Sequence, residues 1–413
     1  MTSIAETVPA SGVDSSYAWC RLAASLALGT IGGVGMWSAI VILPAVQAEF
    51  GVGRGTASLP ITLLMLGFGV GGMVLGRMAD RFGIIPVVLT GIAALGLGYV
   101  GAGLSQSFWQ FALIHGLLLG MLGCAAVFSP LMADISHWFL RNRGIAVATA
   151  ATGNYLSASL WAPVIQHFTA NYGWRHTMFG VGAFCVLTML PLTLALRRKV
   201  SYRDAQAAVA RGSLGAGALG LSPRALQGLL MVAGVACCVA MSMPQVHIVA
   251  YCADLGFGPA RGAEMLTLMM GFGIISRLGS GLVADRIGGL PTLLIGSVMQ
   301  MVALALYLGF SSLPSLYVIA ALFGLFQGGI TPSYAIIVRA YYPPNEAGAR
   351  IGMVMAATML GMAIGGWMNG VVFDITGSYA AAFANGVAWN VLNTGIVLFL
   401  LLRARGRQRL ALA

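Results

Sequence analysis

Twelve apolar segments of about twenty residues each follow one another along this 413-residue chain, and they constrain its fold more than any other feature. The composition agrees, because 59% of the residues are hydrophobic and only 8% are charged. Such segments predict helices that cross a bilayer, since lipid offers no hydrogen-bond partner to an open backbone. We therefore expect an all-α membrane protein with twelve transmembrane helices. The predicted spans are 22–48, 56–76, 84–104, 108–136, 144–169, 176–196, 225–252, 262–283, 290–310, 314–338, 351–373 and 379–402.

The basic residues are placed unevenly with respect to these spans. Eighteen of the 22 lie in the N-terminal tail, the even-numbered loops or the C-terminal tail, and three (Arg54, Arg175 and Arg261) lie in odd-numbered loops. This positive-inside bias predicts that both termini are cytoplasmic. The net charge of +11 then reflects membrane topology and contact with lipid headgroups, and we expect no nucleic-acid partner. Lysine occurs once among these residues, which is typical of a GC-rich bacterial genome and suggests a bacterial inner membrane.

Catalytic and metal-binding patterns are missing from the sequence. The six cysteines are scattered and none shows CxxC spacing, so neither a metal site nor a disulfide framework is indicated. We also find no P-loop, no nucleophile elbow and no paired carboxylates. The sequence therefore predicts that the protein is not an enzyme and uses no cofactor.

A polar, basic segment divides the chain into two sets of six spans. We expect an N-terminal six-helix half at 1–196, a cytoplasmic linker at 197–222 and a C-terminal six-helix half at 223–413. Parallel six-helix repeats are one of the known transporter plans, in which the substrate site lies at the midplane between the halves.

Short motifs repeat between the two halves. "GRMADRFG" at 76–83 recurs as "GLVADRIG" at 281–288, and "EFG" at 49–51 recurs as "DLG" at 254–256, both at an offset of 205 residues. The longer motif resembles the signature between the second and third helices of the major facilitator superfamily. That resemblance implies the superfamily's fold of two six-helix pseudo-repeats.

The repeated motif also suggests a gate. Its glycines predict close helix approach, and its aspartates stand at helix ends, where a carboxylate caps a neighbouring helix or pairs with arginine. Such contacts would hold the two halves together in one state and release them in another. The gating and structural residues predicted from the motif are Gly76, Asp80, Arg81, Gly281, Asp285 and Arg286.

Two further stretches narrow the resemblance to the monocarboxylate transporter family. "DSSYAW" at 14–19 resembles the motif that opens the first helix of that family, and "WFLRNRGIAVATAATG" at 138–153 resembles its fifth-helix motif. We add Arg141 and Arg143 from the second motif, and Asp134 at the end of the fourth span, to the gating residues. The small residues of the second motif are also at helix-packing spacing, which leaves a purely structural interpretation open. The clearest departures from the family pattern are Ser15, Tyr17, Asn142, Ala148 and Thr152.

Arg277 is the one arginine inside a predicted span. At 1.5 Å per residue it lies roughly 12 Å from Asp285 and about 20 Å from Glu264 along the helix. A charge at that depth costs several kcal/mol unless it meets water or an anion. Its planar guanidinium suits a carboxylate, so we interpret Arg277 as an anion-binding group that lines the central cavity. The alternative is an arginine that extends to the lipid headgroups.

The resemblance supports the first interpretation and raises a question about proton coupling. Monocarboxylate transporters carry an arginine at this placement in the eighth helix, with an aspartate one turn earlier, whereas here that earlier position is Gly273. No carboxylate lies deep in any predicted span. A proton would therefore travel on His247 or on the substrate's own carboxyl group.

Five more residues are candidates for the substrate site. His247 and Tyr251 are one helical turn apart and share a face, and a neutral histidine can donate to an anion. Tyr334 offers a hydroxyl donor in the tenth span. Trp37 and Asn154 are placed to line the pore from the first and fifth spans, with Tyr155 as the alternative to Asn154. For the histidine, an interhelical hydrogen bond is the alternative, and for the tryptophan it is packing.

These observations favour a secondary transporter that carries a small organic anion, a monocarboxylate, by alternating access. Coupling by proton symport and coupling by anion exchange both stay open. The expected partners are the anion, protons and membrane lipids, and the expected state is a monomer. The alternative function is efflux of amphipathic drugs or metabolites, because 22 methionines would make a soft cavity.

Overall fold

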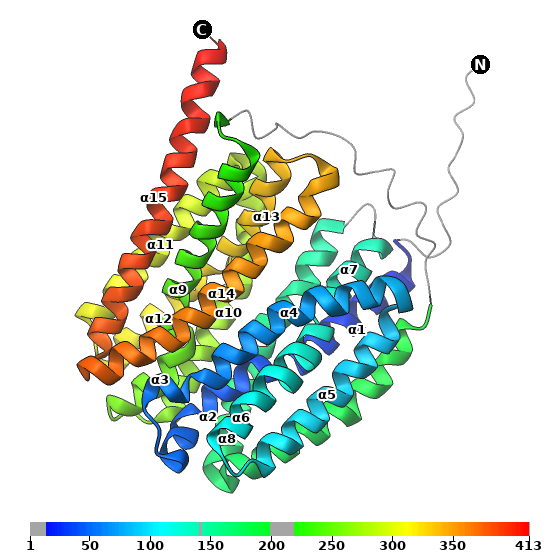
Figure 1. Ribbon diagram of the computed structural model, residues 1–413, viewed down its shortest axis with the longest axis vertical. Coiled ribbons are helices and arrows are strands. Elements are labelled where there is room, and N and C mark those ends of the chain that lie inside the picture. Colours follow the sequence, from blue (N-terminus) through cyan, green and yellow to red (C-terminus); the bar gives the residue numbers. More distant parts are fainter. Residues whose placement is uncertain (1–13, 140–142, 199–218, 413) are drawn as a thin grey trace.

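The structure is a computed structural model that describes residues 14–139, 143–198 and 219–412, almost entirely as helices (Figure 1). The crossings of the first half are coloured blue to green in Figure 1 and those of the second half green to red. The elements are α1 (Ser16–Gly32), α2 (Val34–Phe50), α3 (Arg54–Ala57), α4 (Leu59–Phe82), α5 (Ile84–Leu104), α6 (Phe108–Ile114), the π-helix η1 (His115–Cys124), α7 (Ser129–Trp138), α8 (Arg143–Leu192), the 3-10 helix η2 (Thr193–Leu196), α9 (Pro223–Asp254), α10 (Pro259–Ile287), α11 (Gly289–Gly309), α12 (Leu313–Gln327), α13 (Ile330–Tyr341), α14 (Pro344–Thr376) and α15 (Tyr379–Leu412).

Twelve crossings of the membrane follow from these helices, as the sequence predicts. Eleven helical stretches of the described chain are long and apolar enough to span a bilayer. One stretch, which contains α8, holds two crossings, because the chain turns at Gly173 with a φ of 78° that glycine adopts without strain. An even number of crossings puts the start of α1 and the end of α15 on one side of the membrane. We call that side the terminal face and the opposite side the distal face.

The first crossing begins earlier than predicted. α1 starts at Ser16, so Arg21 lies in the second turn of this helix and not before it. Arg21 is 1% exposed and forms an ion pair with Asp134 of α7 at 2.7 Å. Its guanidinium carbon also lies 4.7 Å from the centre of a Trp138 ring. Because these contacts neutralise the guanidinium, the helix can include this arginine. A search for apolar segments in the sequence leaves the same residue out.

The repeat seen in the sequence is also present in the backbone. Gly83 and Gly288 end the two copies of the longer motif, and both have a φ of 87°. Each donates its backbone N–H to the carbonyl group four residues earlier, at 2.8 Å and 2.9 Å. Gly51 and Gly256, which end the two copies of the shorter motif, both have positive φ as well. The two halves thus turn between their first three crossings in the same way.

Glycines let the helices of each half pack backbone to backbone. A Cβ atom at Gly71 of α4 would stand 2.0 Å from the carbonyl oxygen of Met121, and one at Gly324 of α12 would stand 2.0 Å from that of Met269. By contrast, a Cβ atom at Gly76 or Gly281 would meet nothing within 4 Å. The close approach predicted at these two motif glycines is therefore absent in this conformation, because no neighbouring helix packs against them.

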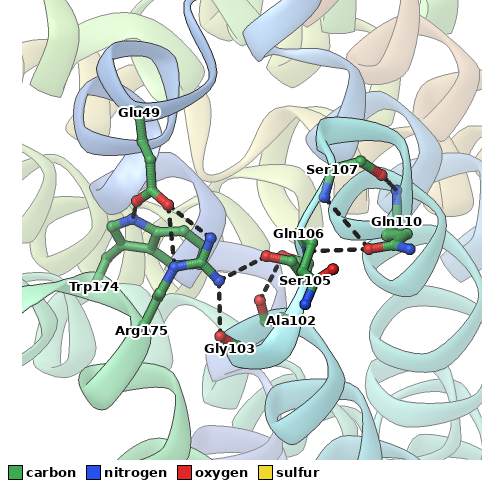
Figure 2. A network of polar contacts seen from close by, with 9 residues as sticks. All are labelled: Glu49, Ala102, Gly103, Ser105, Gln106, Ser107, Gln110, Trp174 and Arg175. Carbon is green, nitrogen blue, oxygen red and sulfur yellow. Dashed lines mark hydrogen bonds and ion pairs between the residues drawn. The ribbon is translucent and has the colours of Figure 1, made fainter.

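A polar network ties together the distal face of the first half (Figure 2). Glu49, at the end of α2, accepts hydrogen bonds from Trp174 at 2.5 Å and from Arg175 at 2.6 Å. Arg175 also donates to the carbonyl oxygens of Gly103, in the last turn of α5, at 2.8 Å and of Ser105, directly after α5, at 2.7 Å. These bonds satisfy helix-end carbonyls that lack partners within their own helix. The network joins crossings of one half and does not reach the other half.

We expect Gly324→Ala to destabilise the protein, because the new methyl group would collide with backbone that cannot move as a flexible side chain does. The cost should be roughly 1–3 kcal/mol. The melting temperature of the purified protein in detergent measures it. Gly395→Ala, in α15, is the matched control, since a Cβ atom there meets nothing within 4 Å. Equal melting temperatures for the two variants would contradict the tight packing.

Candidate substrate site and gate

Arg277 reaches from the second half of the protein to the first. It lies half-buried in α10, and its Nη1 donates to the carbonyl oxygen of Ala151 in α8 at 3.1 Å. Its guanidinium carbon lies 4.4 Å from the centre of the Tyr155 ring, one turn further along α8. A cation over an aromatic face is stabilised by the ring's electron density. Arg277 and Tyr155 therefore form a contact between the halves.

Gly273 creates the space for this arrangement. A Cβ atom at Gly273 would stand 2.5 Å from the Tyr155 ring, so any larger residue would displace the tyrosine. This is the position where the resemblance to monocarboxylate transporters leads one to expect an aspartate. The aromatic ring of Tyr155 occupies the place that an acidic side chain would need. Arg277 thus has an aromatic partner in place of a carboxylate.

The guanidinium of Arg277 keeps unused hydrogen-bonding capacity. Its Nε is buried and has no hydrogen-bond partner among the described residues. Its partners among the described residues are a neutral carbonyl and a ring, neither of which cancels its charge. Guanidinium groups bind carboxylates through paired N–H donors, so this geometry leaves donor capacity for an anion.

Trp37 and Asn154 lie next to this contact. The indole N–H of Trp37 in α2 donates to the side-chain oxygen of Asn154 at 3.1 Å and to its backbone oxygen at 3.2 Å. Asn154 precedes Tyr155 in α8, so the sequence candidates Trp37, Asn154 and Arg277 are gathered around one stretch of that helix. Tyr155, which contacts Arg277 directly, was predicted only as the alternative to Asn154 for a residue that faces the pore. A further signal for it was the glycine at 273, which opens room for a ring.

The other three candidates contact groups within the second half. His247 donates from Nε2 to the Gly366 carbonyl at 2.8 Å, while its Nδ1 is buried without a partner among the described residues. Tyr334 donates to Asn393 at 3.0 Å. Tyr251 packs its ring against Tyr379 and Phe383, whose centres lie 5.0 Å and 5.4 Å away. None of these contacts involves Arg277.

A second arginine, Arg54, joins the halves at the distal face. It is 6% exposed, and its Nη2 donates to both carboxylate oxygens of Asp254 at 2.9 Å and 3.1 Å. Asp374, at the end of α14, accepts the backbone N–H groups of Arg54 at 2.6 Å and Gly55 at 2.7 Å. That carboxylate therefore caps the start of α3 and complements its dipole. We call these contacts the distal lock.

The distal lock was not predicted, although the sequence held a signal for it. Arg54 stands between Gly53 and Gly55 in a loop where the positive-inside bias disfavours arginine. A Cβ atom at Gly53 would lie 2.8 Å from the Asp374 carboxylate, and one at Gly55 would lie 2.7 Å from Val371. The two glycines thus allow α14 to lie close to the backbone before and after Arg54.

The predicted gate on the terminal face is described only in part. Asp134 pairs with Arg21, which belongs to the same half. Arg81 and Arg286 are exposed at the ends of α4 and α10. Arg141 and the side chains of Asp80, Asp285 and Arg143 lie outside the described part of the structure. Every hydrogen bond or ion pair that joins two described residues across the halves lies in the distal part or in the middle of the protein.

Comparison with known proteins places these features in context. The family model of the Major Facilitator Superfamily matches residues 26–307 and 253–411. Monocarboxylate transporter 13 of Rattus norvegicus is 27% identical over 353 residues, covering 83% of this chain and 78% of its own length. Monocarboxylate transporter 11 of Mus musculus is 28% identical over 388 residues, covering 91% of this chain and 85% of its own length.

A solved structure shares the fold. The crystal structure of a bacterial homologue of the human lysosomal transporter Spinster, in an inward-facing and occupied conformation, superposes with a TM-score of 0.73. The match covers 95% of this chain and 97% of that chain, at 14% sequence identity. At that identity the likeness concerns the fold alone.

We expect Arg54→Gln to loosen the distal face, because it removes a charged hydrogen bond worth roughly 2 kcal/mol between the halves. Spin labels at Gln106→Cys and Ser312→Cys, both exposed on the distal face, would report the separation of the halves. Cys20, the exposed native cysteine, would first be replaced by serine. The distance distribution should shift to longer values.

Arg261→Gln is the matched control for this measurement. It breaks an arginine–carboxylate pair on the same face, but Arg261 and Glu264 both belong to the second half. The distance between the labels should stay as in the parent protein. An unchanged distance in Arg54→Gln as well would show that the distal lock does not hold the halves together.

Proposed function

The chain belongs to the major facilitator superfamily, and from that premise we propose that it transports a small organic anion, a monocarboxylate, across the membrane by alternating access. One observation carries the proposal: Arg277 lies half-buried between the halves with a buried Nε that has no partner among the described residues. The relatives named as monocarboxylate transporters support the substrate class. The substrate's carboxylate would accept hydrogen bonds from the guanidinium of Arg277, beside the ring of Tyr155.

Alternating access would use the distal lock and the predicted gate on the terminal face in turn. The distal lock closes one face, and the described cross-half bonds leave the terminal face unjoined. A bound anion would neutralise Arg277 and so lower the cost of moving that charge through a closed, dry intermediate. The halves would then separate at the distal lock and meet at the gating residues Gly76, Asp80, Arg81, Gly281, Asp285 and Arg286.

We propose two routes by which transport of the anion could be coupled to an energy source, proton symport and anion exchange. In proton symport, the proton would travel with the substrate's carboxyl group or on His247, whose Nδ1 is buried and unpartnered among the described residues. In anion exchange, a second anion would neutralise Arg277 on the return step. The protein would act as a monomer in a bacterial inner membrane, with both termini in the cytoplasm.

Efflux of amphipathic compounds is a second candidate, and one observation favours it. An apolar cavity of about 910 Å³ lies between the two arms of α8 and α1, with Trp161, Phe168 and Phe184 among its walls. Exposed apolar residues at its rim, such as Leu160, put this cavity in contact with lipid. Transport through this cavity would not require Arg277.

We expect Arg277→Gln to abolish saturable uptake of labelled acetate, lactate or pyruvate into proteoliposomes. The loss of a charged hydrogen bond predicts at least about a tenfold fall in apparent affinity. Arg277→Lys should keep part of the activity, since it retains the charge and loses the planar fork. Arg286→Gln, an exposed arginine on the same helix, is the control and should transport normally.

Two outcomes would overturn this assignment. Saturable uptake that survives in Arg277→Gln would remove Arg277 from the substrate site. Thermal stabilisation of both the wild type and Arg277→Gln by hydrophobic cationic drugs would favour efflux.

The ring of Tyr155 should matter more than its hydroxyl group. Tyr155→Leu removes the aromatic face beneath Arg277, worth roughly 1 kcal/mol, and should raise the KM for the acid about fivefold. Tyr155→Phe keeps that face and should stay near the wild type. Initial uptake rates over a range of substrate concentrations test this, and equal defects in both variants would assign the role to the hydroxyl instead.

A further inference from the structure

A cavity of about 400 Å³ opens at the distal end of the second half, apart from the site at Arg277. It lies among the ends of α9, α11 and α14 and the start of α15. Its size is within the range of small-molecule sites. Six aromatic residues form much of its wall: Tyr251, Tyr307, Phe310, Phe373, Tyr379 and Phe383.

The residues that line the cavity carry negative charge and no positive charge. Asp254 is the one charged residue among those that line the cavity, and no lysine, arginine or histidine is among them. Its side chain is 36% exposed, so one side of the carboxylate meets Arg54 and part of it stays accessible. Asp254 and the nearby Arg54 and Asp374 together carry a formal charge of −1. The field at this cavity therefore favours a cation.

Tyr307 supplies an independent sign that a ligand belongs here. It is 3% exposed and stacks on Phe383, with ring centres 4.6 Å apart and planes within 7° of parallel. Its hydroxyl is buried and has no hydrogen-bond partner among the described residues. A buried hydroxyl without a partner is costly, so a polar group that enters the cavity would be stabilised by it.

We propose that this cavity binds a small organic cation, such as a protonated primary amine. Aromatic faces and a single carboxylate are the groups that recognise ammonium ions. The ammonium would pair with Asp254 and donate a hydrogen bond to the hydroxyl oxygen of Tyr307. Because Asp254 is also the partner of Arg54, the bound cation would weaken the Arg54–Asp254 pair of the distal lock. The ligand would thus promote opening of the distal face.

The test uses the purified full-length protein in detergent, titrated calorimetrically with ethylammonium and with tetramethylammonium. Both should bind saturably, whereas sodium chloride at the same ionic strength should not. Asp254→Asn should weaken both cations at least about tenfold, because the ion pair is lost. Glu264→Gln is the control, since that carboxylate lies outside the cavity lining and its loss should change nothing.

Tyr307→Phe separates recognition from folding. It keeps the stack on Phe383 and removes only the hydroxyl. Ethylammonium, which has N–H donors, should lose about fivefold in affinity, and tetramethylammonium, which has none, should bind as to the wild type. A structural defect would weaken both cations alike. Absence of saturable binding to the wild type, or equal binding to Asp254→Asn, would overturn the proposal.

The cation could be a free amine or the headgroup of an amine-bearing phospholipid, and nanodiscs distinguish these sources. If the headgroup is the occupant, ethylammonium should bind more weakly in phosphatidylethanolamine nanodiscs than in phosphatidylglycerol nanodiscs. If a free amine is the ligand, the two affinities should agree. The spin-label pair at Gln106 and Ser312 then tests the link to the distal lock, because the bound cation should lengthen the distance.

Discussion

The lack of hydrogen-bond partners in lipid is the constraint on which the rest of this structure depends. It forces the backbone into helices, and it also forces buried side-chain polar groups to find partners inside the protein. Within each half these partners are plentiful. Tyr334, Asn393 and Ser297 form one connected set, in which Asn393 donates to Ser297 at 2.8 Å. Each half is therefore held together by its own polar contacts.

Contacts between the halves include charged side chains. Glycines bring backbones together within a half, as at Gly324, and also across the halves, where Gly55 lies against Gly370. The charged contacts across the halves depend on the side chains of Arg54 and Arg277. Side-chain contacts of this kind can be exchanged for others without unfolding a helix. The charged contacts between the halves are thus adjustable, while each helix keeps its own backbone hydrogen bonds.

The sequence was sufficient to predict the architecture, because the signals for it are local. Apolar length predicts crossings, and the repeated motifs predict matching turns, which Gly83 and Gly288 show. The unusual position of Arg277 was also visible, since a charge in an apolar run stands out. The early start of α1 was missed because Arg21 is charged, and only its partner Asp134, more than a hundred residues later, makes it acceptable.

The candidate site could be predicted less well, because it depends on which helix faces which. The one-turn spacing of His247 and Tyr251 predicts that they lie on one helix. It does not predict which neighbours their side chains contact. Gly366 and Tyr379 are their partners, and both lie more than a hundred residues away in the chain. The role of Tyr155 required knowing that Gly273 lies against it. Long-range pairings of this kind leave only a faint trace in one sequence.

The two arginines that cross between the halves differ in one physical respect, and that difference suggests their roles. Arg54 extends from the first half and meets a carboxylate, so its charge is neutralised without a substrate anion. Arg277 extends from the second half and meets a carbonyl oxygen and a ring, which leave its charge in place. A neutralised pair stabilises one arrangement of the halves. Under the proposed function, a charge without a counter-ion among the described residues would make the closed intermediate costly until an anion binds. The same type of residue would then hold the halves together at one place and make their movement depend on the substrate at another.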